Sequence, residues 1–140
     1  TVLKAASESA VQQKKAVTVL TYLHGVREAQ YAIAELEKEG IELELIELTS
    51  LKPLDMDTIR ASLQQTHRVI ILDESTQSGG VGATISSAIS EQRYEELDGP
   101  VVRLALLDAP VPYASTMEEV IVPRAQDVVE AARKVVGGQL

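Results

Sequence analysis

Short apolar runs and stretches of helical periodicity alternate along this chain. Four of the runs are rich in branched aliphatic residues, which is typical of β-strands. Arg68–Asp73 is apolar without alternation, as expected for a strand that is buried on both faces of a sheet. Ile41–Leu48 begins by alternating, which predicts a strand with one solvated face. The predicted strands are Val17–Tyr22, Ile41–Leu48, Arg68–Asp73 and Val101–Leu106.

A helical pattern follows each predicted strand. Gly40 stands where the first helix would end, and Asp55 is placed to cap the second. Gly79–Gly82 precedes the third helix, and the last is expected at about Ala125–Val136, before Gly137-Gly138. The apolar positions that define the four helices are Val26, Ala29, Ile33 and Leu36, then Ile59 and Leu63, then Ile85, Ala88 and Ile89, and finally Val128, Val129, Ala132 and Val135.

This order of elements predicts the α/β class. Alternating strands and helices require a mostly parallel sheet with right-handed crossovers and with helices on both faces, which is a three-layer α/β/α domain. We expect residues 1–8 to be a disordered or linker-like segment, residues 9–136 to form the domain, and residues 137–140 to form a tail. Within the weakly patterned N-terminal stretch, Ala10–Gln13 is the candidate for a short edge strand.

Composition and charge narrow the classes of partner. The 140 residues include four Tyr but no Phe or Trp, so few side chains could stack on nucleic-acid bases. A net charge of −8 disfavours nucleic acid and membrane surfaces and suits a basic protein partner. The absence of Cys excludes disulfides and thiolate catalysis. The same absence fits a cytoplasmic location, which we expect. Thr1–Ala10 lacks the pattern of a signal peptide, and no apolar run approaches the ~20 residues of a membrane span.

The segment Gly79–Thr84 is rich in glycine and lies between a predicted strand and a predicted helix. The free amides at a helix N-terminus can hold a phosphate group. The dinucleotide fingerprint would need a third glycine where Ile85 stands, and the Gly-Lys-Ser/Thr of a P-loop is absent. The favoured interpretation is that these glycines allow close packing of the helix, and phosphate binding is the alternative.

Few titratable residues stand where chemistry would be expected. His24 follows the first predicted strand, at the edge where open α/β sheets bind ligands, and a general base there is conceivable. No carboxylate close in sequence is expected to orient it, so a solvated or interface histidine is the favoured interpretation. The Asp73-Glu74 pair ends another strand, but neighbours in a strand point to opposite faces. His67 precedes a strand and is expected to be structural. Two isolated histidines without ligand spacing predict no metal site.

The remaining polar features favour contacts over catalysis. Asp108 and Tyr113 flank an Ala-Pro-Val-Pro segment whose prolines fix its shape, which suits a protein contact. The acidic run between Glu35 and Glu47 is expected to be a solvated face. The Gly-x-Ser-x-Gly motif of hydrolases is absent. The residues alone therefore predict no catalytic constellation.

Several segments, taken in order and spacing, resemble those of one family. They are Val17–Tyr22, Leu51–Ile59, Thr66–Glu74, Gly79–Ala83, Leu97–Val101, Asp108–Tyr113 and Pro123. In these segments the chain resembles the C-terminal domain of the beta subunit of the pyruvate dehydrogenase decarboxylating component, and more broadly the transketolase C-terminal domain. The resemblance covers about Ser9–Val136 and is closest to cyanobacterial or plastid-type sequences.

The resemblance implies a five-stranded, mostly parallel sheet with one antiparallel edge strand, for which Ala10–Gln13 is the candidate. It also implies an α₂β₂ enzyme that uses thiamine diphosphate and Mg²⁺ to decarboxylate pyruvate and to acylate lipoyl groups. In that family the alpha subunit and the preceding domain of the beta subunit hold the cofactor. No catalytic, cofactor-binding or metal-binding residue is therefore carried over to this chain, and the plastid stroma becomes a second candidate location.

The resemblance further implies a role in assembly. The partners would be a second beta subunit, the alpha subunit, and the basic subunit-binding domain of the dihydrolipoyl acetyltransferase. Asp98 matches a docking contact of the family, and the other candidate contacts are Asp108, Tyr113 and the terminal carboxylate at Leu140. Two alternatives stay open: a free-standing phosphate- or nucleotide-binding module that uses Gly79–Thr84, or the same domain from a branched-chain 2-oxo acid or acetoin dehydrogenase.

Overall fold

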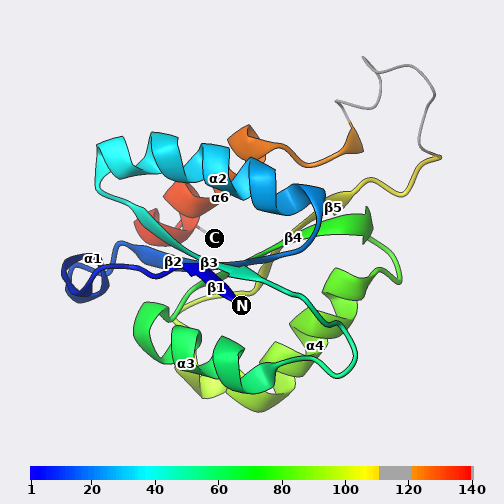
Figure 1. Cartoon of the computed structure of the whole chain (residues 1–140), viewed down its shortest axis with the longest axis horizontal. Coiled ribbons are helices and arrows are strands. Elements are labelled where there is room, and N and C mark those ends of the chain that lie inside the picture. Colours follow the sequence, from blue (N-terminus) through cyan, green and yellow to red (C-terminus); the bar gives the residue numbers. More distant parts are fainter. Residues whose placement is uncertain (111–120, 140) are drawn as a thin grey trace.

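The structure is a computed structural model that describes residues 1–110 and 121–139. From residue 16 onward, strands and helices alternate in the order expected (Figure 1). The strands are β1 (Val2–Lys4), β2 (Ala16–Thr21), β3 (Glu42–Glu47), β4 (Val69–Thr76) and β5 (Val102–Leu106). The α-helices are α1 (Glu8–Gln12), α2 (His24–Leu36), α3 (Met56–Thr66), α4 (Val81–Arg93) and α6 (Ala125–Gly137), and Glu37–Glu39 and Tyr94–Glu96 form 3₁₀ turns.

The strands form one sheet in the order β1-β3-β2-β4-β5. The strand β1 runs antiparallel to β3, whereas the other neighbours are parallel. Helices α2 and α6 cover one face and α3 and α4 cover the other (Figure 1). The predicted three-layer α/β/α fold, with a mostly parallel five-stranded sheet and one antiparallel edge strand, is therefore confirmed.

The two halves of the core lie on opposite faces of this sheet. On the α2/α6 face, Val17 and Val19 pack with Ala29 and Val128. On the α3/α4 face, the core is built around aliphatic side chains of β2 and β4 and of the helices that cover them, Leu20, Ile71, Ile59, Ile85 and Ile89. The alternation of side chains along β2 supplies both halves, because successive residues point to opposite faces.

The prediction of an edge strand at Ala10–Gln13 is wrong. The edge strand is β1, where Val2 pairs with Ile46 of β3, so the segment 1–8 expected to be linker-like contains a strand. Ala10 instead lies in α1, because the Ser7 hydroxyl accepts a hydrogen bond from the Ala10 amide and caps that helix. No helix among the described residues is long and apolar enough to cross a membrane.

Candidate functional site

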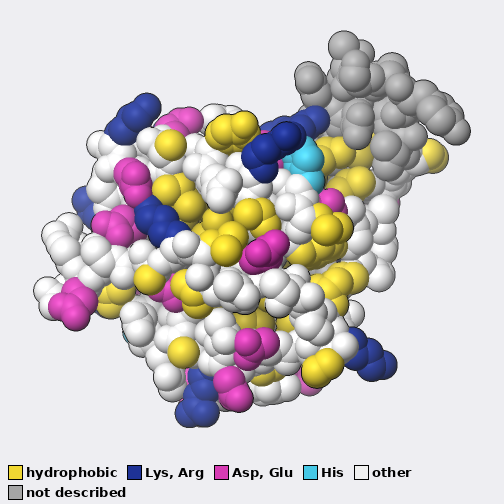
Figure 2. Space-filling model, viewed as in Figure 1, with side chains coloured by type: hydrophobic (Ala, Val, Ile, Leu, Met, Phe, Trp, Pro, Cys, Tyr) yellow, Lys and Arg dark blue, Asp and Glu magenta, His cyan; other side chains and the backbone are white. Residues whose placement is uncertain are grey.

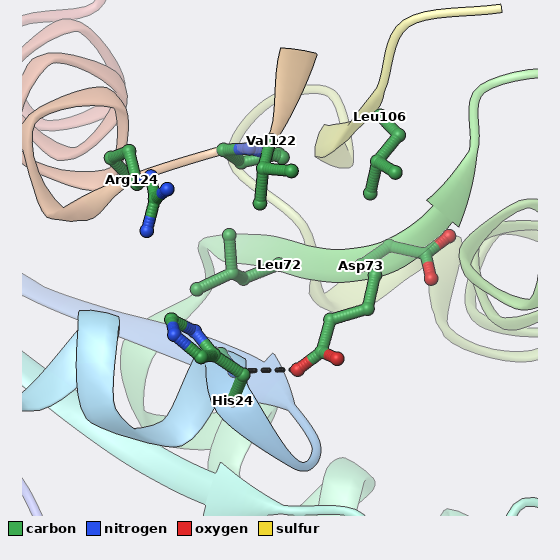
Figure 3. A pocket seen from close by; sticks show the side chains of 9 residues that line it. His24, Leu72, Asp73, Leu106, Val122 and Arg124 are labelled. Atoms are coloured by element: carbon green, nitrogen blue, oxygen red, sulfur yellow. Dashed lines mark hydrogen bonds between the residues drawn. The ribbon is translucent and has the colours of Figure 1, made fainter. Parts of the chain in front are cut away.

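The carboxyl ends of β2 and β4 form the edge of the sheet at which a ligand site is expected. These neighbouring parallel strands continue into helices on opposite faces, which is the topological switch point where open α/β sheets bind ligands. A cavity of about 450 Å³ lies there and is called the switch-point cavity below (Figure 3). It is lined by His24, Gly25, Leu72, Asp73, Glu74, Leu106, Val122, Pro123 and Arg124.

The tight start of α2 shapes one side of the switch-point cavity. Leu23 caps this helix with a φ of 49°, a conformation that is strained for a leucine. A Cβ atom on Gly25 would lie only 2.1 Å from the Thr21 hydroxyl, so only glycine fits at this close approach of helix and strand. The Gly25 amide donates a 2.7 Å hydrogen bond to Glu74 Oε1, which ties α2 to β4.

His24 has an acidic neighbour, Glu28, so the expectation that no carboxylate close in sequence could orient it is wrong. Glu28, four residues further along α2, is buried, and its Oε2 accepts a 3.0 Å hydrogen bond from the Ala125 amide. Its Oε1 lies 3.8 Å from both His24 Nδ1 and Arg124 Nη1. An Arg27 guanidinium nitrogen lies 2.6 Å from His24 Nε2. Because a guanidinium can only donate, this contact assigns the proton of a neutral His24 to Nδ1. The i, i+4 spacing of His24 and Glu28 was the available signal.

The Asp73 carboxylate binds the backbone of the glycine-rich segment at the start of α4. Asp73 Oδ2 accepts a 2.7 Å hydrogen bond from the Gly82 amide, and Oδ1 accepts bonds from Tyr22 and Ser75. The chain's own carboxylate therefore occupies the position at the start of α4 that a phosphate would take, which argues against the phosphate-binding alternative. Because Glu74 reaches α2 on the other face, the expected divergence of this acidic pair is confirmed.

The pKa of Tyr22 is raised to about 12, mainly by burial and further by the hydrogen bond and the negative charge of Asp73. Burial disfavours a charged phenolate, and the nearby carboxylate disfavours a second negative charge. Tyr22 is thus held as a neutral hydrogen-bond donor to Asp73, at 2.6 Å between the oxygens.

Asp98 lies at the opposite, amino-terminal edge of the sheet. Its carboxylate is 42% exposed, and Oδ2 lies 3.7 Å from an Arg68 guanidinium nitrogen. A hollow of about 180 Å³, the Asp98 hollow, lies beside it and is lined by Arg68, Asp98, Gly99, Pro100, Val135, Val136 and Gly138. The last three of these lining residues come from the C-terminal end of α6 and its cap, where the helix dipole is negative.

Of the other three predicted contact residues, Asp108 lies among the described residues. Both oxygens of Asp108 accept hydrogen bonds from Ser78, at 2.9 Å from its amide and 2.5 Å from its hydroxyl. These bonds hold the pKa of Asp108 below its ordinary value. Tyr113 and Leu140 lie outside the described residues. His67 Nδ1 lies 2.9 Å from the carbonyl oxygen of Glu96, a local contact that fits the expected structural role.

Comparison with known proteins identifies the family. The model of the transketolase C-terminal domain matches residues 8–128. The chain belongs to the transketolase C-terminal domain family. A solved structure described as "Split gene transketolase, inactive beta4 tetramer" shares this transketolase C-terminal fold with a TM-score of 0.78 and 28% identity, over 98% of this chain and 41% of that one.

Curated relatives of this transketolase C-terminal domain carry the name pyruvate dehydrogenase E1 component subunit beta. The mitochondrial protein of Drosophila melanogaster is 45% identical over 90% of this chain and 35% of its own length. That of Porphyra purpurea is 37% identical over 90% of this chain and 38% of its own. The chloroplastic beta-2 protein of Arabidopsis thaliana is 39% identical over 84% of this chain and 29% of its own length. The chain thus spans about a third of the length of these relatives.

Proposed function

We propose that this chain is the C-terminal assembly domain of the beta subunit of a thiamine-diphosphate-dependent pyruvate dehydrogenase. The observation that carries the proposal is the 45% identity, over 90% of the chain, to a protein named as that beta subunit. The partners are a second beta subunit, the alpha subunit and the subunit-binding domain of the acetyltransferase. The relatives' names include mitochondrial and chloroplastic ones, which favours an organelle over the cytoplasm expected from the sequence.

The described residues do not form a site for thiamine diphosphate and Mg²⁺. Among them, no group of three or more His, Asp or Glu side chains is arranged to hold a metal ion. The amide of Gly82, at the start of α4 where a diphosphate could bind, already donates to Asp73. We therefore propose that this domain contributes to the enzyme by assembly and does not hold the cofactor.

The Asp98 hollow supports the docking of a basic partner. On the face shown in Figure 2, acidic and basic side chains are interspersed. That face offers a basic partner no continuous acidic patch, so we propose a local docking site. The half-exposed Asp98 carboxylate and the negative end of α6 attract a cationic side chain, while Val135 and Val136 contact its aliphatic part. A lysine or arginine of the partner would share Asp98 with Arg68.

The experiment is a calorimetric titration of the chain with an isolated acetyltransferase subunit-binding domain. We expect Asp98→Lys to weaken binding by about tenfold or more, because a like charge then faces the basic partner. Glu130→Lys makes the same charge change at an exposed position of α6 and is the matched control. Added salt should weaken the wild-type complex. Equal affinity of the two variants would remove Asp98 from the docking site, and absence of any wild-type binding would contradict the docking role.

Association between beta subunits needs its own measurement. The structural neighbour is described as a beta4 tetramer, which supports self-association of domains with this fold. We expect sedimentation velocity to show a concentration-dependent dimer of this chain in the micromolar range or above. A strictly monomeric chain at millimolar concentration would contradict a self-association role for the isolated domain.

A further inference from the structure

We propose that the switch-point cavity is a binding site for a small monocarboxylate with a short aliphatic body. The proposal is independent of the assembly role. The cavity lies where open α/β sheets bind ligands, and its volume of about 450 Å³ falls within the range of small-molecule pockets. Its inner wall is apolar, since Leu72 and Leu106 are buried and Val122 lies opposite Leu72 across the cavity (Figure 3).

The acidic side chains around the switch-point cavity already accept hydrogen bonds from the protein. Asp73 accepts from Tyr22, Ser75 and Gly82, and Glu74 accepts from the Gly25 amide. These bonds direct the acidic groups toward the helix termini that they cap. Asp73 and Glu74 at the cavity wall therefore stabilise the fold and are not available to bind a ligand.

The basic side chains retain donor capacity toward the switch-point cavity. Arg124, the N-cap residue of α6, and His24, at the start of α2, extend their side chains into the cavity (Figure 3). Their side chains are 36% and 41% exposed, and each lies 3.8 Å from Glu28 Oε1, which is beyond hydrogen-bonding distance. The guanidinium carries five N–H donors and the neutral imidazole one at Nδ1. This donor excess fits a ligand group that only accepts.

The charge balance disfavours a ligand with more than one negative charge. Two guanidinium groups, of Arg27 and Arg124, stand near three carboxylates, of Glu28, Asp73 and Glu74. This surplus of negative charge penalises a dianionic phosphate more than a carboxylate, which one guanidinium can bind through two parallel hydrogen bonds. No aromatic side chain is among the described residues that line the cavity, so a nucleotide base would find no stacking partner.

The test titrates the 140-residue chain with butyrate as the probe and detects binding by ¹H–¹⁵N NMR. Butyrate should cause saturable shifts at Gly25 and Glu74 and at the Ala125 amide. Butyramide has the same size without the charge, and inorganic phosphate has charge without the apolar body. Both should bind at least about tenfold more weakly than butyrate, because an ionised acceptor strengthens the bond to Arg124 and the apolar body contacts the cavity wall.

Two variants locate the site. We expect Arg124→Gln to weaken butyrate binding by about tenfold, since it loses the charged donor pair. Arg60→Gln, on α3 at the other face of the sheet, should leave binding unchanged. His24→Gln probes the same site from α2 and serves alone if Arg124→Gln does not fold. Butyrate binding that is unchanged in every cavity variant that folds, or butyramide binding as tight as butyrate, would overturn the proposal. Phosphate binding as tight as butyrate would overturn the choice of a monocarboxylate.

Discussion

Asp73 and Gly82 meet at the start of α4, where the Asp73 carboxylate accepts a 2.7 Å hydrogen bond from the Gly82 amide. A side chain of β4 thereby caps the helix that follows, and the negative carboxylate lies at the positive end of the helix. A Cβ atom on Gly82 would lie 2.3 Å from Asp73 Oδ2, so the close contact requires a glycine. The glycine-rich loop is thus explained by packing against the chain's own acid.

Gly82→Ala should destabilise the fold, although alanine normally favours a helix. The added methyl group would overlap Asp73 and force either the acid or the helix to move, at a cost of about 1–3 kcal/mol. Chemical denaturation measures the change. Gly99→Ala is the control, because no atom lies within 4 Å of its added Cβ. A Gly82→Ala chain as stable as wild type would show that Asp73 does not constrain this position.

The ionisation of Tyr22 should report its contact with Asp73. Spectrophotometric titration of the phenol at alkaline pH, corrected with Tyr22→Phe, should give a pKa of about 12 in the folded chain. Asp73→Asn removes the charge but keeps an acceptor, so the pKa of Tyr22 should fall toward its ordinary 10.0 while burial keeps it higher. An unchanged titration in Asp73→Asn would exclude any influence of Asp73.

The same pKa shift sets a pH window for stability. The pKa of Tyr22 is raised on folding, so the unfolded chain loses the phenolic proton first. The stabilisation is complete below pH 10 and declines as the pH rises from about 10 toward 12. The free energy of unfolding of Tyr22→Phe should show a smaller decline over this window than that of wild type.

The sequence predicted the parts of the fold that depend on local patterns. The apolar runs at Val17–Tyr22 and Arg68–Asp73 correspond to β2 and β4, because strands in the middle of a sheet are apolar on both faces. The strand β1 was missed because three residues carry no period, and its position depends on pairing with β3, more than forty residues away. The apolar pair Val2-Leu3 was its only local signal.

The candidate site could be predicted only in outline. The position of His24 at the carboxyl edge follows from the order of strands and helices. The partners of the acids do not follow from spacing, because Glu28 reaches Ala125 and Glu74 reaches Gly25 across the fold. The acidic run between Glu35 and Glu47, which was expected to be a solvated face, also includes a residue with a distant partner. Glu44 is buried and accepts a hydrogen bond from the Ala6 amide.

The buried hydroxyl cluster beneath β2 gives a prediction on stability. Thr18 Oγ1 lies 2.6 Å from Ser62 Oγ and 2.6 Å from Thr66 Oγ1, and all three residues are buried. Thr18→Val keeps the shape but removes the shared partner, which should cost about 1–3 kcal/mol in the free energy of unfolding. Thr84→Val, at an exposed position of α4, is the control and should change stability by less than about 0.5 kcal/mol. A neutral Thr18→Val would mean that the cluster contributes no net stability.

The hydrogen bonds from Ser7 to Glu42 should stabilise the N-terminal segment to an extent that depends on pH. Its carboxylate accepts hydrogen bonds from the Ser7 amide and hydroxyl, both at 2.8 Å, and the amide bond is the larger cause of a pKa below the ordinary 4.5. Because the folded pKa is depressed, the stabilisation is present above pH 4.5 and is lost as the pH falls through the folded value. Hydrogen-exchange protection at Ser7 should therefore decrease between pH 6 and pH 3, by about one order of magnitude or less for so exposed a bond.

Glu42→Gln tests the origin of this pH dependence. The amide side chain still accepts a hydrogen bond but carries no charge, so protection at Ser7 should be lower than in wild type at pH 6 and should no longer change with pH. Glu130→Gln, exposed on α6, should retain the wild-type profile. Protection at Ser7 that falls with acid equally in Glu42→Gln would contradict the assignment of the pH dependence to Glu42.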